Sequence, residues 1–158
     1  MKFAKNLVLH QFGCNGEYMD KEELINSFIE DIIFYRDYSS VKNSFLNDNY
    51  DSKKSHKTLL KITKKAQKLY ENYYDDFVNL LNHSNLKVSS KVAEYLYPLF
   101  PKTCISILEK YISTLDEKLD IMPIKQEIEG FKKSQKFFVD EFKKFYKTDD
   151  IASLNKET

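Results

Sequence analysis

The feature that most constrains the fold is a pair of apolar stripes, at residues 88–99 and 104–115, joined by a short segment with prolines. Within each stripe the apolar residues recur at spacings of three and four, as on one face of an α-helix. Pro98 and Pro101 interrupt the helical pattern, because proline lacks the amide that a helix interior needs, although it fits the first turn of a new helix. Two amphipathic helices linked this closely are expected to lie nearly antiparallel. The positions are Val88, Val92, Leu96, Leu99, Cys104, Ile105, Leu108, Tyr111, Ile112 and Leu115.

The residues around this pair predict its caps and its outer face. Asn85 is expected to cap the first helix of the pair, and Asp75 to cap a preceding short helix that ends near His83. The polar residues between the apolar positions are expected to face water, since the apolar stripe faces inward. They are Lys87, Ser90, Lys91 and Glu94.

Further helices are predicted on both sides. Asp20 and Glu23 have the spacing of a capping box and begin a helix that ends near Tyr38. A polar connection follows at 39–52, with one helical turn at 41–46, and a long helix runs over 55–73. After a charged connection at 116–122, Pro123 is expected in the first turn of a last helix, which Gly130 divides.

Glycine and proline number three each, too few for the many turns of a sandwich or barrel. The sequence therefore predicts an all-α fold, a superhelical bundle of about five to seven helices. We expect one domain over residues 1–147, with an undecided segment at 1–19 and a frayed tail at 148–158.

The central run, LLNHSNLKVSSKVAEYLYPLFPKTCISILEKYI, resembles the signature of the bacterial DUF2019 family, small proteins similar to HEAT repeats. The resemblance extends over residues 20–146. It implies a stack of helix pairs and, through immunity proteins of this kind of fold that are encoded beside bacterial toxins, a cognate toxin as partner. Ser89 and Ser90 depart from the pattern, as does the lysine-rich long helix. The matching positions are Leu80, Leu81, Asn85, Val88, Ala93, Pro101, Leu108 and Glu109.

The formal charge of +1 gives no overall field toward nucleic acid or membrane. No stretch approaches the roughly twenty apolar residues of a membrane span, and the N-terminus lacks the pattern of a secretory signal. Cys14 and Cys104 have no metal-ligand spacing, so the reducing cytoplasm is the expected location.

The sequence predicts no catalytic, cofactor or metal site. Cys104 falls on an apolar face, where a thiol behaves as a small hydrophobe. His10 and Cys14 lack the further ligands that a metal needs, and Asp75 and Asp76 are better explained by the helix start. An enzymatic function would need a pocket with perturbed carboxylates, which sequence alone does not reveal.

Two surfaces remain as candidate binding sites. Tyrosine beside acid suits a protein interface, so the leading hypothesis is a non-catalytic protein-binding domain that uses Tyr73, Tyr74, Asp75 and Asp76. The alternative is a regulatory or nucleic-acid-binding module that uses a lysine face, formed by Lys57, Lys61, Lys64 and Lys68. Arg36 is the only arginine in the chain, which weighs against specific base or phosphate recognition.

Overall fold

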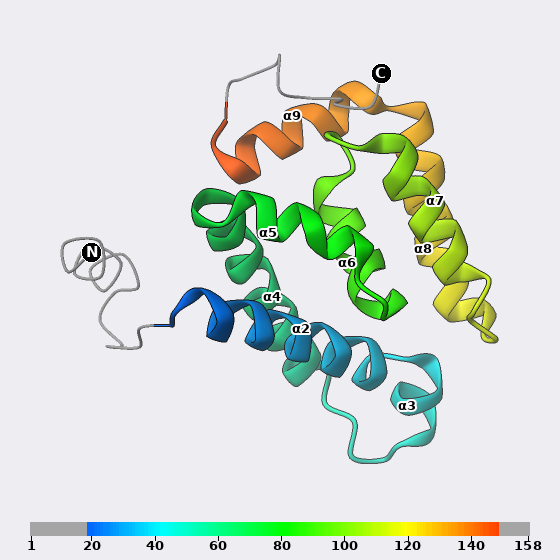
Figure 1. Cartoon of the computed structure of the whole chain (residues 1–158). Coiled ribbons are helices and arrows are strands. Elements are labelled where there is room, and N and C mark those ends of the chain that lie inside the picture. The colour runs from blue at the N-terminus through cyan, green and yellow to red at the C-terminus, as the bar shows by residue number, and fades with distance from the viewer. Residues whose placement is uncertain (1–18, 149–158) are drawn as a thin grey trace.

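The computed structural model describes residues 19–148, and within them the chain is all-helical, with eight α-helices, one short 3₁₀ helix and no strand (Figure 1). The all-α prediction is confirmed. All but the last residue of the undecided segment at 1–19, and all but the first residue of the predicted tail at 148–158, lie outside the described residues, and so do His10 and Cys14.

The N-terminal layer consists of α2 (Lys21–Tyr38), α3 (Val41–Leu46) and α4 (Ser52–Asn72). The predicted cap is confirmed, since Asp20 accepts a hydrogen bond from the Glu23 amide at 2.9 Å. The short helical turn at 41–46 is confirmed as α3. Helix α4 begins three residues earlier than predicted, because Asp51 caps it by accepting from the Lys53 amide. Leu24, Phe28 and Ile32 on α2 are fully buried and hold the two long helices together.

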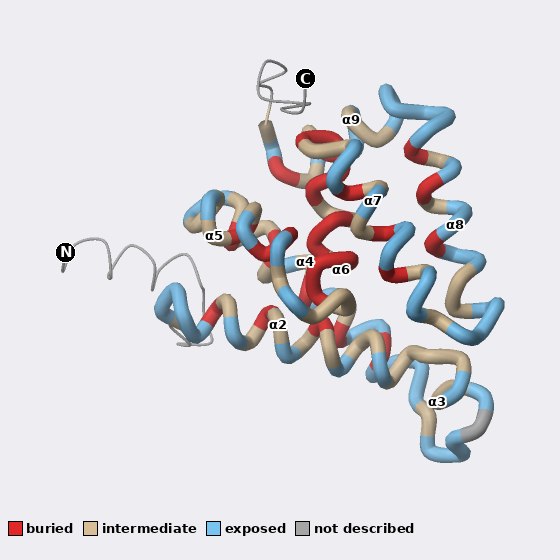
Figure 2. Tube along the Cα trace, turned by 45° about the vertical axis from the view of Figure 1, so that its right-hand side comes forward, coloured by how far each residue is buried: buried red, intermediate tan, exposed pale blue. Residues whose placement is uncertain are grey.

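The centre of the fold is α6 (Leu86–Leu96), which packs against α7 (Pro101–Ile112) and also against α2. Figure 1 shows α6 between α2 and α9, and Figure 2 shows the buried positions concentrated along α6 and the sides of the helices that face it. Asn85 caps α6 and Pro101 begins α7, as predicted. Asp75 does not cap a helix: α5 (Tyr74–Asn79) begins one residue before it, so its carboxylate lies in the first turn. Helix α5 leads into the 3₁₀ helix η2 (Leu80–Asn82).

The C-terminal hairpin of α8 (Lys118–Lys133) and α9 (Gln135–Tyr146) corrects two predictions. Helix α8 starts at Lys118, so Pro123 lies inside it and not in its first turn. The break falls at Ser134 and not at Gly130. Gly130 lies inside α8, where a Cβ would come within 3.4 Å of the Phe138 ring on α9, an ordinary van der Waals contact.

Candidate functional site

Three of the four polar residues of α6 that were predicted to face water are covered by protein, which corrects that prediction, while the Lys87 side chain is 39% exposed. Ser90 is fully buried, and the side chains of Lys91 and Glu94 are each only 12% exposed. They are covered because α2 crosses one side of α6 and α8 lies nearby, so the helix has protein neighbours on its polar side as well as its apolar one. Charges buried in this way need partners close at hand.

A cleft of about 350 Å³ lies at this polar side and is formed by α2, α3, α6, α7 and α8. We call it the charged cleft. The charged side chains that line it are Arg36, Asp37, Lys87, Lys91, Glu94, Asp120 and Glu127. Such a concentration of charge in a hollow between helices makes the charged cleft the leading candidate for a functional site.

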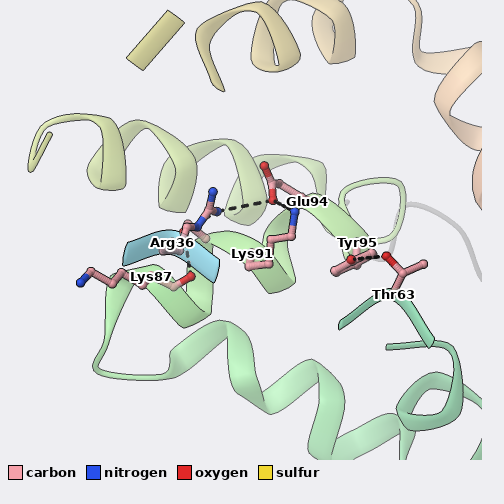
Figure 3. Close-up of polar contacts among 7 residues, drawn as sticks. Arg36, Thr63, Lys87, Lys91, Glu94 and Tyr95 are labelled. Carbon is pink, nitrogen blue, oxygen red and sulfur yellow. Dashed lines mark hydrogen bonds and ion pairs between the residues drawn. The ribbon is translucent and has the colours of Figure 1, made fainter. Parts of the chain in front are cut away.

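Glu94 is the centre of the charged cleft. Its Oε2 atom lies 3.0 Å from Lys91 Nζ and 3.4 Å from Arg36 Nη2, and both cationic side chains point toward it (Figure 3). Burial alone would raise the pKa of Glu94, but Lys91 and Arg36 outweigh burial and hold its pKa at about 2. Glu94 is therefore ionised at neutral pH and pairs with two buried cations, Arg36 and Lys91.

Glu127 on α8 has the opposite protonation state. Burial, and then the negative charge of Glu94 beside it, raise the pKa of Glu127 to about 9. The Glu127 carboxyl is thus protonated at neutral pH and donates a hydrogen bond to the Glu94 carboxylate. Two neighbouring glutamates share one negative charge, which is the arrangement that two close carboxylates favour.

Aromatic rings and a serine complete the floor of the charged cleft. The Arg36 guanidinium lies 4.8 Å from the centroid of Tyr111, and its Nη2 donates to Ser90 Oγ at 3.1 Å. Lys91 Nζ lies 5.3 Å from the centroid of Tyr35. These contacts are cation–π interactions, which gain strength where water is excluded. The Arg36 Nε atom is buried and has no hydrogen-bond partner among residues 19–148.

The rim of the charged cleft is partly apolar. Leu119 lines it from the first turn of α8 and is 56% exposed. Beside it, Asp120 Oδ1 accepts a hydrogen bond from the Val41 amide at 2.9 Å, which joins the start of α3 to α8. Lys87 and Asp37 form an ion pair at another part of the rim.

The tyrosine and aspartate cluster proposed from the sequence lies away from the charged cleft. Tyr73 and Tyr74 are half-buried and pack against the hydrophobic core, so packing occupies much of their surface. Asp76 pairs with Lys21 at 3.2 Å, and Asp75 is exposed. Of the four residues, Asp75 is the one that the structure leaves most available to a partner.

Three of the four lysines of the predicted lysine face are exposed. Lys57, Lys61 and Lys64 are exposed on α4 and make no ion pair with any residue between 19 and 148. Lys68 is half-buried, and burial, followed by repulsion from Lys64 and Lys65, lowers its pKa. Lys65 turns to α2 instead, where it binds Asp31 and Ser27. The acidic α2 and basic α4 thus complement each other at this contact.

Cys104 and His83 occupy positions where their side chains serve the fold. Cys104 is fully buried, as predicted, and the His83 Nδ1 atom accepts a hydrogen bond from the Asn85 amide at 3.0 Å. Residues 19–148 contain no group of three or more histidine, cysteine or acidic side chains placed to hold a metal ion. Across the same residues, every helix is too short or too polar to cross a membrane.

The charged cleft was not predicted from the sequence, although two signals pointed toward it. Arg36 is the only arginine, and it comes four residues after Ile32, the last of the regularly spaced buried residues of α2. A charge at such a position needs a partner. Ser89 and Ser90 stood out as polar residues in the central helix, and both are buried. The contribution of Glu127 had no comparable signal, because it depends on how α8 packs.

In comparisons with known proteins, no family model, no curated protein and no solved structure matches this chain. The geometry of the charged cleft and of the exposed surfaces is therefore what indicates a function.

Proposed function

We propose that this chain is a non-catalytic helical protein that binds a protein partner at the charged cleft. The observation that carries the proposal is the combination of a charged floor with an apolar rim at Leu119. Arginine and tyrosine are the residue types that most often dominate binding energy at protein interfaces, and here Arg36 and Tyr111 stack at the floor. The internal pairing around Glu94 keeps these groups in fixed positions before a partner arrives.

The protonation states support a binding function over catalysis. A general base works best with a pKa near neutral pH. Glu94, with a pKa of about 2, is tied to two cations, whereas Glu127, with a pKa of about 9, holds its proton. Neither carboxyl has the pKa near 7 that suits a general base.

The narrower form of the proposal is an immunity protein that neutralises a cognate bacterial toxin by direct binding. It rests on the resemblance to the DUF2019 family together with the cleft. Co-expression with a toxin-like protein encoded beside it is expected to restore growth, and size-exclusion chromatography with light scattering is expected to show a stoichiometric complex. Absence of both protection and complex would contradict this proposal.

A pair of variants tests whether the charged cleft is the binding surface. Leu119→Arg places a long cation on the rim of the cleft and is expected to abolish protection and complex formation. Leu60→Arg is the matched control, because Leu60 is also an exposed leucine but lies on α4 and does not line the cleft. Equal loss in both variants, or in neither, would place the partner elsewhere.

The second candidate function is nucleic-acid binding by the lysine face. It is favoured by one observation, the three exposed lysines on α4 that no described acid neutralises. Binding to DNA or RNA is expected to weaken steeply with salt, since each phosphate contact releases a counterion. Exchange of Lys57, Lys61, Lys64 and Lys68 for glutamate is expected to abolish it, while Leu119→Arg leaves it unchanged. Binding that is insensitive to salt would contradict this alternative.

A further inference from the structure

Three stacked aromatic rings lie where the last turns of α2 pack against the start of α4 (Figure 1). Phe34 stacks on Tyr38 with ring centroids 5.1 Å apart and ring planes at 15°, and Tyr38 stacks on Tyr50 at 5.1 Å. The Asp51 amide donates a hydrogen bond to the Tyr38 hydroxyl at 2.7 Å, which holds the middle ring in place. We call these three rings the ring stack. Because Tyr38 contacts both of the others, Phe34 forms one end of it.

Phe34 is the open end of the ring stack and is 38% exposed. Tyr38 covers one face of its ring. The Lys54 ammonium lies 5.3 Å from the Phe34 centroid and 5.5 Å from the Tyr38 centroid. An atom that is about equally far from two stacked rings lies beside the stack and not on its outer face. Neither contact therefore covers the outer face of Phe34, where a further flat ring can stack.

Lys54 also connects the ring stack to the lysine face of α4. Positions 54, 57, 61 and 64 are separated by three, four and three residues, so their side chains lie along one side of the helix. All four lysines are exposed, and none forms an ion pair with a residue between 19 and 148. At a rise of about 1.5 Å per residue, this line of positive charge is about 15 Å long. It begins beside the ring stack.

The acids of α2 nearest to the ring stack do little to neutralise this charge. Asp31 binds Lys65, and Asp37 pairs with Lys87, so both carboxylates are already occupied. Glu30, one turn before Phe34, is exposed and has no ion pair within the described part of the chain. Four free lysines outnumber this one acid, so the surface attracts anions.

Positive charge beside an exposed flat ring is the combination that binds single-stranded nucleic acid. Lysines neutralise phosphates, and an aromatic ring stacks on the face of any base. In a duplex the base faces are stacked on one another, whereas an unpaired strand leaves them open to a protein ring. The scarcity of arginine is no obstacle, because binding without sequence preference needs charge and not a bidentate fork. An anionic membrane fits less well, since Phe34 lies flat against Tyr38 and does not project as an inserting side chain would.

We propose that the ring stack and the lysines at 54, 57, 61 and 64 form a binding site for single-stranded DNA or RNA of any sequence. The four lysines hold phosphates, and the outer face of Phe34 stacks on one base. This inference rests on the second candidate function and narrows it to unpaired strands. It is independent of the charged cleft, which none of these residues lines.

Three DNA probes test the proposal on the full chain by fluorescence anisotropy. They are a labelled single strand of mixed sequence, a strand of the same length with abasic sites in place of the bases, and the duplex that the first strand forms with its complement. The single strand is expected to bind about tenfold more tightly than the abasic strand, the worth of one stacked base. It is also expected to bind more tightly than the duplex.

A pair of phenylalanine variants locates the stacked base. Phe34→Leu keeps an apolar side chain but removes the flat ring, so the single strand and the abasic strand are expected to bind it equally. Phe45→Leu is the matched control, because Phe45 is 73% exposed on α3 but is not part of the ring stack. It is expected to keep the tenfold preference.

A pair of lysine variants tests the phosphate contacts. With four contacts to a single strand, the logarithm of the binding constant is expected to fall with the logarithm of salt concentration at a slope of about −3. Lys61→Gln is expected to make this slope shallower by about 0.7. Lys125→Gln removes an exposed lysine of α8 instead and is expected to leave the slope unchanged.

Several outcomes overturn the inference: equal binding of the normal and abasic strands, a preference that survives Phe34→Leu, or a preference that Phe45→Leu also removes. Tighter binding to polyglutamate or to phosphatidylserine vesicles than to the single strand would assign the surface to an acidic protein or to a membrane. If the duplex binds as tightly as the single strand, with the same salt dependence, the second candidate function stands and this inference fails. If no nucleic acid binds, both fail.

Discussion

The charged cleft can be compared with a second hollow between α6, α8 and α9, which we call the aromatic groove because most of its lining residues, such as Tyr95, Tyr97 and Phe131, carry aromatic rings. The two hollows border the same residue, Glu94, but are held together by different forces. The cleft depends on buried charges that neutralise one another, whereas the groove depends on stacked rings and neutral hydrogen bonds. Charges respond to pH and to the loss of a single partner, and rings respond to changes of shape. One short helix, α6, supplies residues to both regions, so the comparison can be tested by substitutions only a few residues apart.

The largest difference is expected from Glu94→Gln. The amide keeps the size of the side chain but removes the anion that Arg36 and Lys91 contact, and the loss of one partner from a buried ion pair costs about 3–5 kcal/mol in the free energy of unfolding. Ionisation of Glu127, which is then no longer beside a charged Glu94, recovers part of this cost at pH 7. Because the pKa of Glu94 is lowered from 4.5 to about 2, its stabilisation is present above pH 4.5 and is lost as pH falls toward 2. Urea unfolding should therefore show the wild type and the variant converging in acid.

The control for this prediction is Glu109→Gln. Glu109 pairs with Lys132 at 3.6 Å with both side chains more than half exposed, so its loss is expected to cost under about 0.5 kcal/mol. Similar costs for Glu94→Gln and Glu109→Gln would mean that burial does not distinguish the two ion pairs.

Glu127→Gln should act in the opposite direction and stabilise the protein. The folded state holds the Glu127 proton up to a pKa of about 9, while the unfolded chain releases it near 4.5, so the wild type loses stability as pH rises between these values. Glutamine still donates to Glu94 without this penalty. We expect almost no gain at pH 4 and a gain that grows by roughly 1.4 kcal/mol for each pH unit above 4.5, to several kcal/mol at pH 8. A variant that is less stable than the wild type at pH 8 would contradict the protonated state of Glu127.

In the aromatic groove, Tyr97→Phe should cost about 1 kcal/mol, because it removes the buried hydrogen bond to the Phe131 carbonyl. Unlike the effect of Glu94→Gln, this cost is expected to stay constant from pH 4 to pH 8. Tyr146→Phe is the matched substitution at a hydroxyl without a partner and should be nearly neutral. Thermal unfolding of the two variants side by side measures the difference; equal costs would show that the hydrogen bond contributes nothing.

The smallest effect is expected at Gly130, in the wall between α8 and α9. Alanine favours a helix interior over glycine by up to about 1 kcal/mol, and the new Cβ would meet the Phe138 ring at 3.4 Å, an ordinary contact. We expect Gly130→Ala to stabilise the protein by about 0.5 kcal/mol. Destabilisation in a denaturant titration would show instead that the Phe138 ring has no room to adjust.

The helices that form these two regions show which features could be predicted from the sequence. Spacing and capping predicted α2, α3, α6 and α7 well, because Asp20, Asn85 and Pro101 act on their own helices. Asp75 and Pro123 misled the prediction, since both occur in a helix but not at the position that local preference favours. Packing between distant segments can override such local preferences.

The candidate sites were harder to predict than the helices. The lysine face follows from the periodicity of a single helix and was found, whereas the charged cleft combines Arg36, Glu94 and Glu127 from three helices and was not. Helical periodicity indicates which side of a helix is polar, but it does not reveal whether another helix covers that side. The polar side of α6 was assigned to water for this reason.

The bond between the Val41 amide and Asp120 joins residues 79 positions apart at the rim of the charged cleft. A backbone amide held by a distant carboxylate gives up its proton to solvent only when the two segments separate. The hydrogen-exchange rate of the Val41 amide therefore reports how often the start of α3 separates from α8 at the rim of the charged cleft. Measured with and without a partner, this rate reports binding at the cleft without a label and without knowledge of what binds.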